Sequence, residues 1–162
     1  PYTTLFRSAI VLVRPAWVTD SAPENMAPNA EVGKLLADHS AEDAAAIFAK
    51  SATAQRLASE SPDNLASLRG FFTRKPQAGT ARLLTAISAD GPRIGKDELR
   101  NLRLPALVCG TTEDAIHPMA HAAELATLIP QARLVDLPPK GRDKPAHLAA
   151  LAAAMSRFLK EI

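Results

Sequence analysis

An aspartate lies just beyond the end of a predicted buried strand, where catalytic groups are common. The apolar run Ala106–Cys109 ends at Gly110, a polar turn carrying Asp114 follows, and Pro118 opens an alanine-rich helical segment. A second apolar run, Ala132–Leu137, comes after that segment, so the order predicts a βαβ unit. In open α/β sheets, ligands and catalytic groups gather at the carboxyl ends of the strands. Asp114 is therefore the first candidate for a catalytic residue.

Asp114 also has a purely structural interpretation. A short acidic side chain before a helix accepts hydrogen bonds from backbone N–H groups, so Asp114 equally suits a turn residue or an N-cap. The neighbouring Glu113 competes with it for an acidic role. The position of Asp114 in the βαβ unit leaves both interpretations open.

Motifs of several other kinds of chemistry are missing from the sequence. Neither any serine nor Cys109 has a glycine both two residues before and two residues after it, as in the G-x-S-x-G motif of serine nucleophiles. No G-x-G-x-x-G or G-x-x-x-x-G-K-[ST] loop is present to bind a phosphate. His117 and His121 are four residues apart, but they lack the intervening glutamate and further ligands of a zinc site. We expect no cofactor and no metal.

The rest of the chain predicts one strand followed by a long helical stretch. Residues 9–13 form a β-branched-rich run, typical of a strand that is buried on both faces of a parallel sheet. Residues 16–28 contain prolines without a clear period and predict a loop. From about Asn29 to Leu102 the sequence predicts successive short helices. The fold class is therefore α/β.

Local signals indicate where several of these helices begin. Ser40 with Asp43 resembles a capping box, and Ser61 followed by Pro62 predicts a second helix start. The last helix is expected from about Lys144. It has one apolar face at three- and four-residue spacing that should pack against the sheet, made of Leu148, Leu151, Met155, Phe158, Leu159 and Ile162.

The acidic turn resembles that of the α/β-hydrolase family. Gly110, Asp114 and Pro118 have the spacing G-x-x-x-D-x-x-x-P, which favours Asp114 over Glu113 as the acidic residue. In that family the turn supplies the acid of a Ser–His–Asp triad. The resemblance therefore implies that Asp114 orients and supports a catalytic histidine.

The layout of the chain is similar to the carboxyl-terminal half or more of an α/β hydrolase. Helices inserted between two core strands are where this family places a cap over its active site. The resemblance implies a core strand at residues 9–15, a helical cap at 16–102 and the remaining α/β core at 103–162. The implied sheet is mostly parallel.

The position of the catalytic histidine departs from the family pattern. The family places this residue after a glycine in the loop beyond the last strand, where this chain has Gly141 and then Arg142. An arginine stays protonated and cannot serve as a base. His147, five residues later, is the candidate base, although it also fits an ordinary surface or helix-start histidine. His117, inside the acidic turn, is expected to line the pocket.

Composition restricts the class of protein. The chain has 162 residues, of which 47% are hydrophobic and 22% charged, which is typical of one globular domain. The formal net charge of +2 comes from scattered basic residues, so we expect no binding to nucleic acid or membranes. The single cysteine, Cys109, cannot form an intrachain disulfide, and we expect a buried thiol and a cytoplasmic protein. The expected partner is a small-molecule substrate, and the sequence leaves the oligomeric state open.

The first eight residues, PYTTLFRS, resemble a translated sequencing adapter, and we expect them to be an artefact. The natural sequence would then start at Ala9 inside a strand, which implies that upstream sequence with the nucleophile is missing. A strand at residues 9–13 without its neighbour would present an unpaired edge. We therefore expect the isolated chain to aggregate or to remain partly unfolded.

Three functions are compatible with the sequence. The first is the carboxyl-terminal part of a serine hydrolase acting on an ester or related carbonyl substrate, inactive alone without its nucleophile. The second is a hydrolase-like binding protein without catalysis, which Arg142 favours. The third, a doubly wound domain that binds a nucleotide or another anion, is disfavoured by the missing glycine-rich loop.

Overall fold

The computed structural model describes residues 9–162, so the predicted artefact at residues 1–8 lies outside the described residues. Within the described part, three parallel strands form one sheet in the order β1-β2-β3. They are β1 (Ile10–Val13), β2 (Ala106–Thr111) and β3 (Ala132–Leu137). Because the strands are parallel and in register, their carboxyl ends lie along one edge of the sheet. This arrangement confirms the predicted α/β class.

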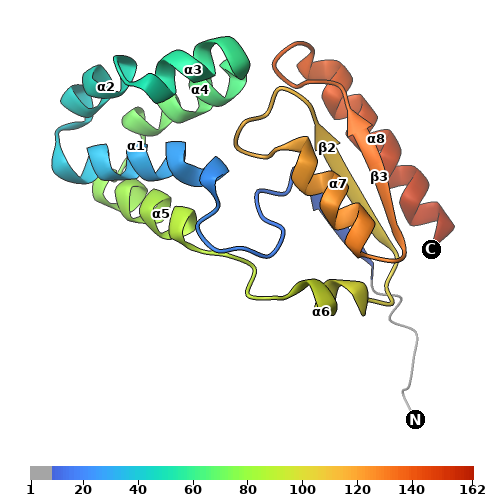
Figure 1. Cartoon of the computed structure of the whole chain (residues 1–162). Helices are drawn as coiled ribbons and strands as arrows, with labels where there is room; N and C mark the ends of the chain where they lie inside the picture. The colour runs from blue at the N-terminus through green and yellow to red at the C-terminus, as the bar shows by residue number, and fades with distance from the viewer. Residues whose placement is uncertain (1–8) are drawn as a thin grey trace.

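The central strand β2 is buried along its whole length, and its side chains alternate between two cores. Ala106 and Val108 pack against α7 (Met119–Leu128), whereas Leu107 and Cys109 pack against α8 (Lys144–Glu161). The two helices therefore cover opposite faces of the sheet (Figure 1). A continuous apolar run is the pattern expected of such a strand. The thiol of Cys109 is fully buried, as predicted.

The predicted apolar face of α8 is partly wrong. Phe158 is buried against the sheet, but Leu148 and Leu159 are 53% and 59% exposed. Each lies one residue away from the row that contacts the sheet, which is a rotation of about 100° around the helix. His147, which the sequence places at the start of this helix, lies at the start of that row and is buried rather than at the surface.

Between β1 and β2 the chain forms a helical insertion. Residues 27–89 contain five α-helices with a core of their own, which includes the tilted ring pair of Phe48 and Phe72. Figure 1 shows these helices as a group beside the sheet and its two covering helices. The elements of the insertion are η1 (Glu24–Met26), α1 (Ala27–Asp38), α2 (Ala41–Ala49), α3 (Ala52–Glu60), α4 (Pro62–Gly70), η2 (Phe71–Thr73), α5 (Gln77–Ala89) and α6 (Lys96–Arg100).

The helix starts follow the sequence signals with two differences. Ser40 caps α2 by accepting a hydrogen bond from the Asp43 N–H, and Pro62 opens α4, as predicted. Ser61, however, makes no capping bond, because its hydroxyl accepts from the N–H of Ala115 in the acidic turn. The predicted loop at residues 16–28 is too long, since η1 and the start of α1 lie inside it.

The close packing of α1 against α5 depends on Gly33. A Cβ at this position would lie 2.9 Å from the backbone nitrogen of Thr85 and 3.0 Å from the Leu84 Cβ. Gly33→Ala is therefore expected to force the helices apart and lower the free energy of unfolding by about 1–3 kcal/mol. Urea unfolding followed by circular dichroism measures this change.

Gly70→Ala is the matched control for this prediction. Gly70 also lies in a helix of the insertion, but nothing would lie within 4 Å of its added Cβ. Since alanine favours helix more than glycine does, this variant should be neutral or slightly more stable. Equal destabilisation by both substitutions would contradict the close-packing explanation.

Within residues 9–162, no helix combines the length and the hydropathy that a membrane span requires.

Candidate active site

The predicted catalytic aspartate lies in the turn between β2 and α7. Thr111, the last residue of β2, donates a hydrogen bond from its hydroxyl to the carbonyl of Leu137 at the end of β3, with the two oxygens 2.9 Å apart. Glu113 has a φ of 59°, a left-handed conformation that reverses the chain direction. Asp114 follows and is buried, with 8% of its surface exposed. The turn thus places one carboxylate inside and leaves its neighbour Glu113 nearer the surface.

Three residues from separate segments hold the Asp114 carboxylate. Arg14 donates from Nε to Oδ2 at 2.6 Å, and its Nη2 forms an ion pair with the same oxygen at 2.5 Å. The Asn64 amide donates to Oδ1 at 3.1 Å. The backbone N–H of His117 also donates to Oδ1, at 3.0 Å, and the ring Nδ1 of His117 lies 3.1 Å from this oxygen. Both carboxylate oxygens are therefore hydrogen-bonded.

Sequence reasoning missed Arg14. It directly follows β1, adopts a φ of 50°, and donates its backbone N–H to the carbonyl of Cys109 in β2. The signal was available, because residues that follow adjacent parallel strands emerge at the same edge of a sheet. Arg14 and Asp114 have these equivalent positions, although they are 100 residues apart in the chain.

Sequence reasoning also missed Asn64, which connects the helical insertion to the acidic turn. While its amide nitrogen donates to Asp114, its amide oxygen accepts from the N–H groups of Ala115 at 2.7 Å and Ile116 at 3.3 Å. Asn64 is buried in α4. One side chain therefore fixes both the carboxylate and the backbone of the turn.

The Asp114 network keeps the carboxyl ionised. Burial alone would raise the pKa of Asp114. The hydrogen bond and charge of His117, and the charge and hydrogen bond of Arg14, outweigh burial and hold the pKa well below the usual value of 3.8. An ionised carboxylate that accepts several hydrogen bonds is the form in which a triad acid supports its histidine.

This low pKa makes folding stability depend on pH. The unfolded chain takes up a proton at Asp114 near pH 3.8, whereas the folded chain does so only at lower pH. The unfolded state therefore binds more protons in this range, and stability should fall as the pH drops below about 5. Urea midpoints between pH 7 and 3 measure this slope, which should be shallower in Asp114→Asn. An unchanged slope would contradict the assigned pKa direction.

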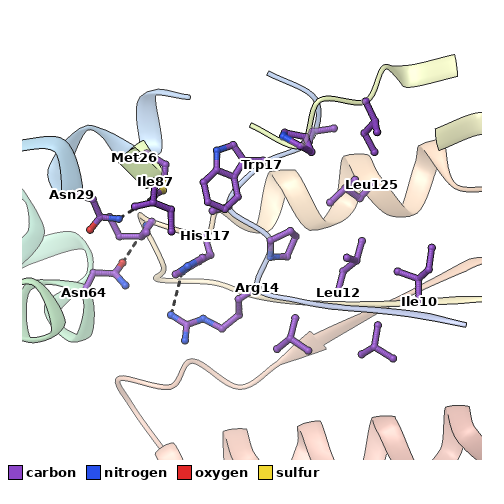
Figure 2. Close-up of a pocket in the computed structure, with 18 of the residues that line it drawn as sticks. Ile10, Leu12, Arg14, Trp17, Met26, Asn29, Asn64, Ile87, His117 and Leu125 are labelled. Carbon is purple, nitrogen blue, oxygen red and sulfur yellow. Dashed lines mark hydrogen bonds between the residues drawn. The ribbon is translucent and has the colours of Figure 1, made fainter. Parts of the chain in front are cut away.

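A cavity of about 700 Å³ lies beside the network. Figure 2 shows Arg14, His117 and Asn64 at one end of it and the apolar side chains of Leu12 and Leu125 toward the other. His117 lines this cavity, as predicted, whereas Asp114 lies behind it and is not among the described lining residues. The whole of β1 also borders the cavity, and β1 is the edge of the sheet that has no neighbouring strand among residues 9–162.

The structure does not join His147 to Asp114 by a hydrogen bond. His147 lies in the first turn of α8 with 3% of its surface exposed, and its Nδ1 lies 2.8 Å from the carbonyl oxygen of Pro138. It is not among the described residues that line the cavity. Arg142, which stands where the resemblance placed the histidine, forms an exposed ion pair with Glu113.

Comparison with solved structures identifies the architecture. A thermophilic esterase from Thermogutta terrifontis, with malate bound, has a TM-score of 0.58 to this chain and 20% identity. An enol-lactonase from Burkholderia xenovorans LB400 has a TM-score of 0.55 and 26% identity. Each match covers 94% of this chain. The chain has part of the α/β-hydrolase fold.

The part that matches is about half of a complete hydrolase fold, since the chain covers 56% of either protein. An α/β hydrolase from Sphaerobacter thermophilus DSM 20745 gives a similar result, with 19% identity, a TM-score of 0.51 and coverage of 93% and 58% of the two chains. Neither a protein-family model nor a curated protein sequence matches the chain.

Proposed function

We propose that this chain is the carboxyl-terminal part of a hydrolase that cleaves a small ester or a related carbonyl compound. The observation that carries this proposal is the buried, ionised Asp114 at the carboxyl end of β2, behind a largely apolar cavity. A substrate pocket commonly has this character, apolar walls with a few convergent polar groups. The esterase and the enol-lactonase among the similar structures support the same class of reaction.

In this proposal Asp114 is the triad acid and residues 16–102 form a cap over the cavity. The proposed substrate is a small molecule, and the proposed location is the cytoplasm. The nucleophile belongs to sequence upstream of Ala9, because no residue of this chain has the glycine spacing of a nucleophile elbow. The 162-residue chain is then inactive alone, since it cannot carry out the covalent step.

His147 remains the residue that the sequence predicts as the catalytic base. Its Nδ1 faces the Pro138 carbonyl, which fixes the ring but supplies no negative charge to stabilise an imidazolium. The histidine in direct contact with Asp114 is His117.

The second candidate function is a binding protein without catalysis. Arg142 favours it, because this residue stands at the histidine position of the family and pairs with Glu113 at the surface. In this case the cavity would hold a small molecule without cleaving it. The two functions differ in whether the longer protein turns a substrate over.

The deciding experiment compares the 162-residue chain with the longer protein encoded by its extended reading frame. Hydrolysis of short-chain p-nitrophenyl esters is measured for both. We expect the longer protein to hydrolyse these esters and the 162-residue chain not to. Asp114→Asn should reduce the rate of the longer protein roughly 10⁴-fold. Asp136→Asn, in the exposed part of β3, is the matched control and should keep the full rate. Ester binding without turnover by the longer protein would instead support the second function.

A further inference from the structure

A general base needs a carboxylate on one ring nitrogen and access to the substrate at the other, and His117 has both a carboxylate neighbour and a place on the cavity wall. Its Nδ1 lies 3.1 Å from Oδ1 and 3.2 Å from Oδ2 of Asp114. His117 lines the cavity, and 30% of its side chain is exposed. Because Nδ1 is held by the carboxylate, the edge of the ring that carries Nε2 is the one left to face the cavity. Nε2 has no hydrogen-bond partner among the described residues. The carboxylate thus lies behind the imidazole, and the space for a substrate lies in front of it.

The hydrogen-bond donors and acceptors around Nδ1 decide which nitrogen can accept a proton. Asp114 only accepts, so this contact requires a proton on Nδ1. The Arg14 guanidinium only donates, and its Nη2 lies 3.4 Å from the same nitrogen, so this contact requires a bare Nδ1. The carboxylate contacts are shorter and involve a charged acceptor, and charge-assisted hydrogen bonds are the stronger kind. The favoured tautomer therefore carries its proton on Nδ1 and leaves a lone pair on Nε2.

The backbone reinforces this orientation. The N–H of His117 donates to the same Asp114 oxygen that faces the ring, so residues 114 and 117 are joined twice. Asn64 and Arg14 hold the carboxylate from the other sides. Asp114 and His117 are therefore held together in an arrangement in which His117 already lines the cavity.

We propose that His117, rather than His147, is the catalytic base of this site. This inference rests on the proposed hydrolase function. Nε2 of His117 accepts the proton of a hydroxyl nucleophile while the hydroxyl oxygen bonds to the carbonyl carbon and the C=O electron pair moves to oxygen. When the tetrahedral species collapses, the bond to the leaving alkoxide breaks and Nε2 returns the proton to it. Asp114 remains ionised and stabilises the imidazolium between the two transfers.

The first test measures the tautomer in the 162-residue chain, independently of any activity. Long-range ¹H–¹⁵N correlation spectra, recorded where the imidazoles are neutral, show which ring nitrogen bears the proton. We expect the Nδ1–H form for His117 and a loss of this preference in Asp114→Asn. A proton on Nε2, with Nδ1 accepting from Arg14, would overturn the proposal.

The second test uses the longer protein and covers the case in which the short chain does not fold. His117→Gln should lower kcat by 10³-fold or more with little change in KM. Added imidazole should restore part of the rate to His117→Ala, which a merely structural role would not allow. His121→Gln is the matched control, because this histidine is also half-buried and bonds only the Ala16 carbonyl through Nδ1; it should keep the rate.

The outcomes separate the two proposals. Turnover that survives His117→Gln but is lost in His147→Gln would overturn the assignment of the base and leave the hydrolase function standing. An absence of turnover in the unmodified longer protein would overturn the hydrolase function and the base assignment with it.

Discussion

Asp114→Leu is expected to lower the free energy of unfolding by about 3–5 kcal/mol, the usual cost of removing one partner from a buried ion pair. The side chain of Asp114 is 3% exposed and that of Arg14 is 20% exposed, so water replaces little of the lost attraction. The substitution leaves the Arg14 guanidinium facing an apolar side chain. It also removes the acceptor of the Asn64 amide.

The double variant Arg14→Met/Asp114→Leu should recover part of this loss. Replacing both partners removes the unpaired charge and fills the space with apolar atoms, which is often neutral or stabilising. The coupling energy from a double-mutant cycle, measured by urea unfolding, should therefore be clearly different from zero.

The exposed pair Lys34–Asp38 is the matched control for this cycle. Both residues lie on α1 at i,i+4 spacing, and both side chains are largely exposed. Replacing both by alanine, singly and together, should show little coupling. Equal coupling in the two pairs would contradict a special role for burial around Asp114.

Asn64→Leu is expected to have a second large effect, because one amide satisfies three groups. Its loss leaves the N–H groups of Ala115 and Ile116 without this acceptor and removes a donor from Asp114. Ser61 still accepts from Ala115, so we expect a cost of about 3–4 kcal/mol, since each unsatisfied buried group costs about 1–3 kcal/mol.

Thermal and urea unfolding measure this change, and Ser67→Ala provides the control. Ser67 lies one turn further along α4, is exposed, and borders the same cavity. It should change stability by less than about 0.5 kcal/mol. If Asn64→Leu were as mild, the amide would not be what holds α4 to the acidic turn.

The sequence was sufficient to predict the strands of the sheet and the position of Asp114 after β2. Continuous apolar runs predicted β1 and β2, an interrupted apolar pattern predicted β3, and the turn spacing predicted that Asp114 would follow β2, because all of these signals are local. The residues that hold Asp114 could not be found in this way. Asn64 and Arg14 are 50 and 100 residues from it in the chain, and no periodicity relates positions that distant.

The predictions that were wrong, for the apolar face of α8 and the loop at residues 16–28, have local physical causes. Leu148 and Leu159 share the three- and four-residue spacing of α8, but they lie to the side of the row that the sheet covers. A proline-containing stretch predicted a loop at residues 16–28, yet proline is well tolerated in the first turn of a helix, where Pro28 lies in α1. The position of His147 was predicted, whereas its burial was not.

The helical insertion between β1 and β2 also determines how this sheet can assemble. Pairing Val13 with Cys109 closes a loop that contains the whole insertion, and closing so long a loop from an unstructured chain costs entropy and slows folding. The core around Phe48, in contrast, joins residues that all lie between Val32 and Leu84, so its contacts close shorter loops than the pairing of Val13 with Cys109 does. If the helices of this core form first, they shorten the effective loop and bring Asn64 into position before Arg14 reaches the acidic turn. The order of folding events would then be insertion first, parallel strand pairing second, and the Asp114 network last.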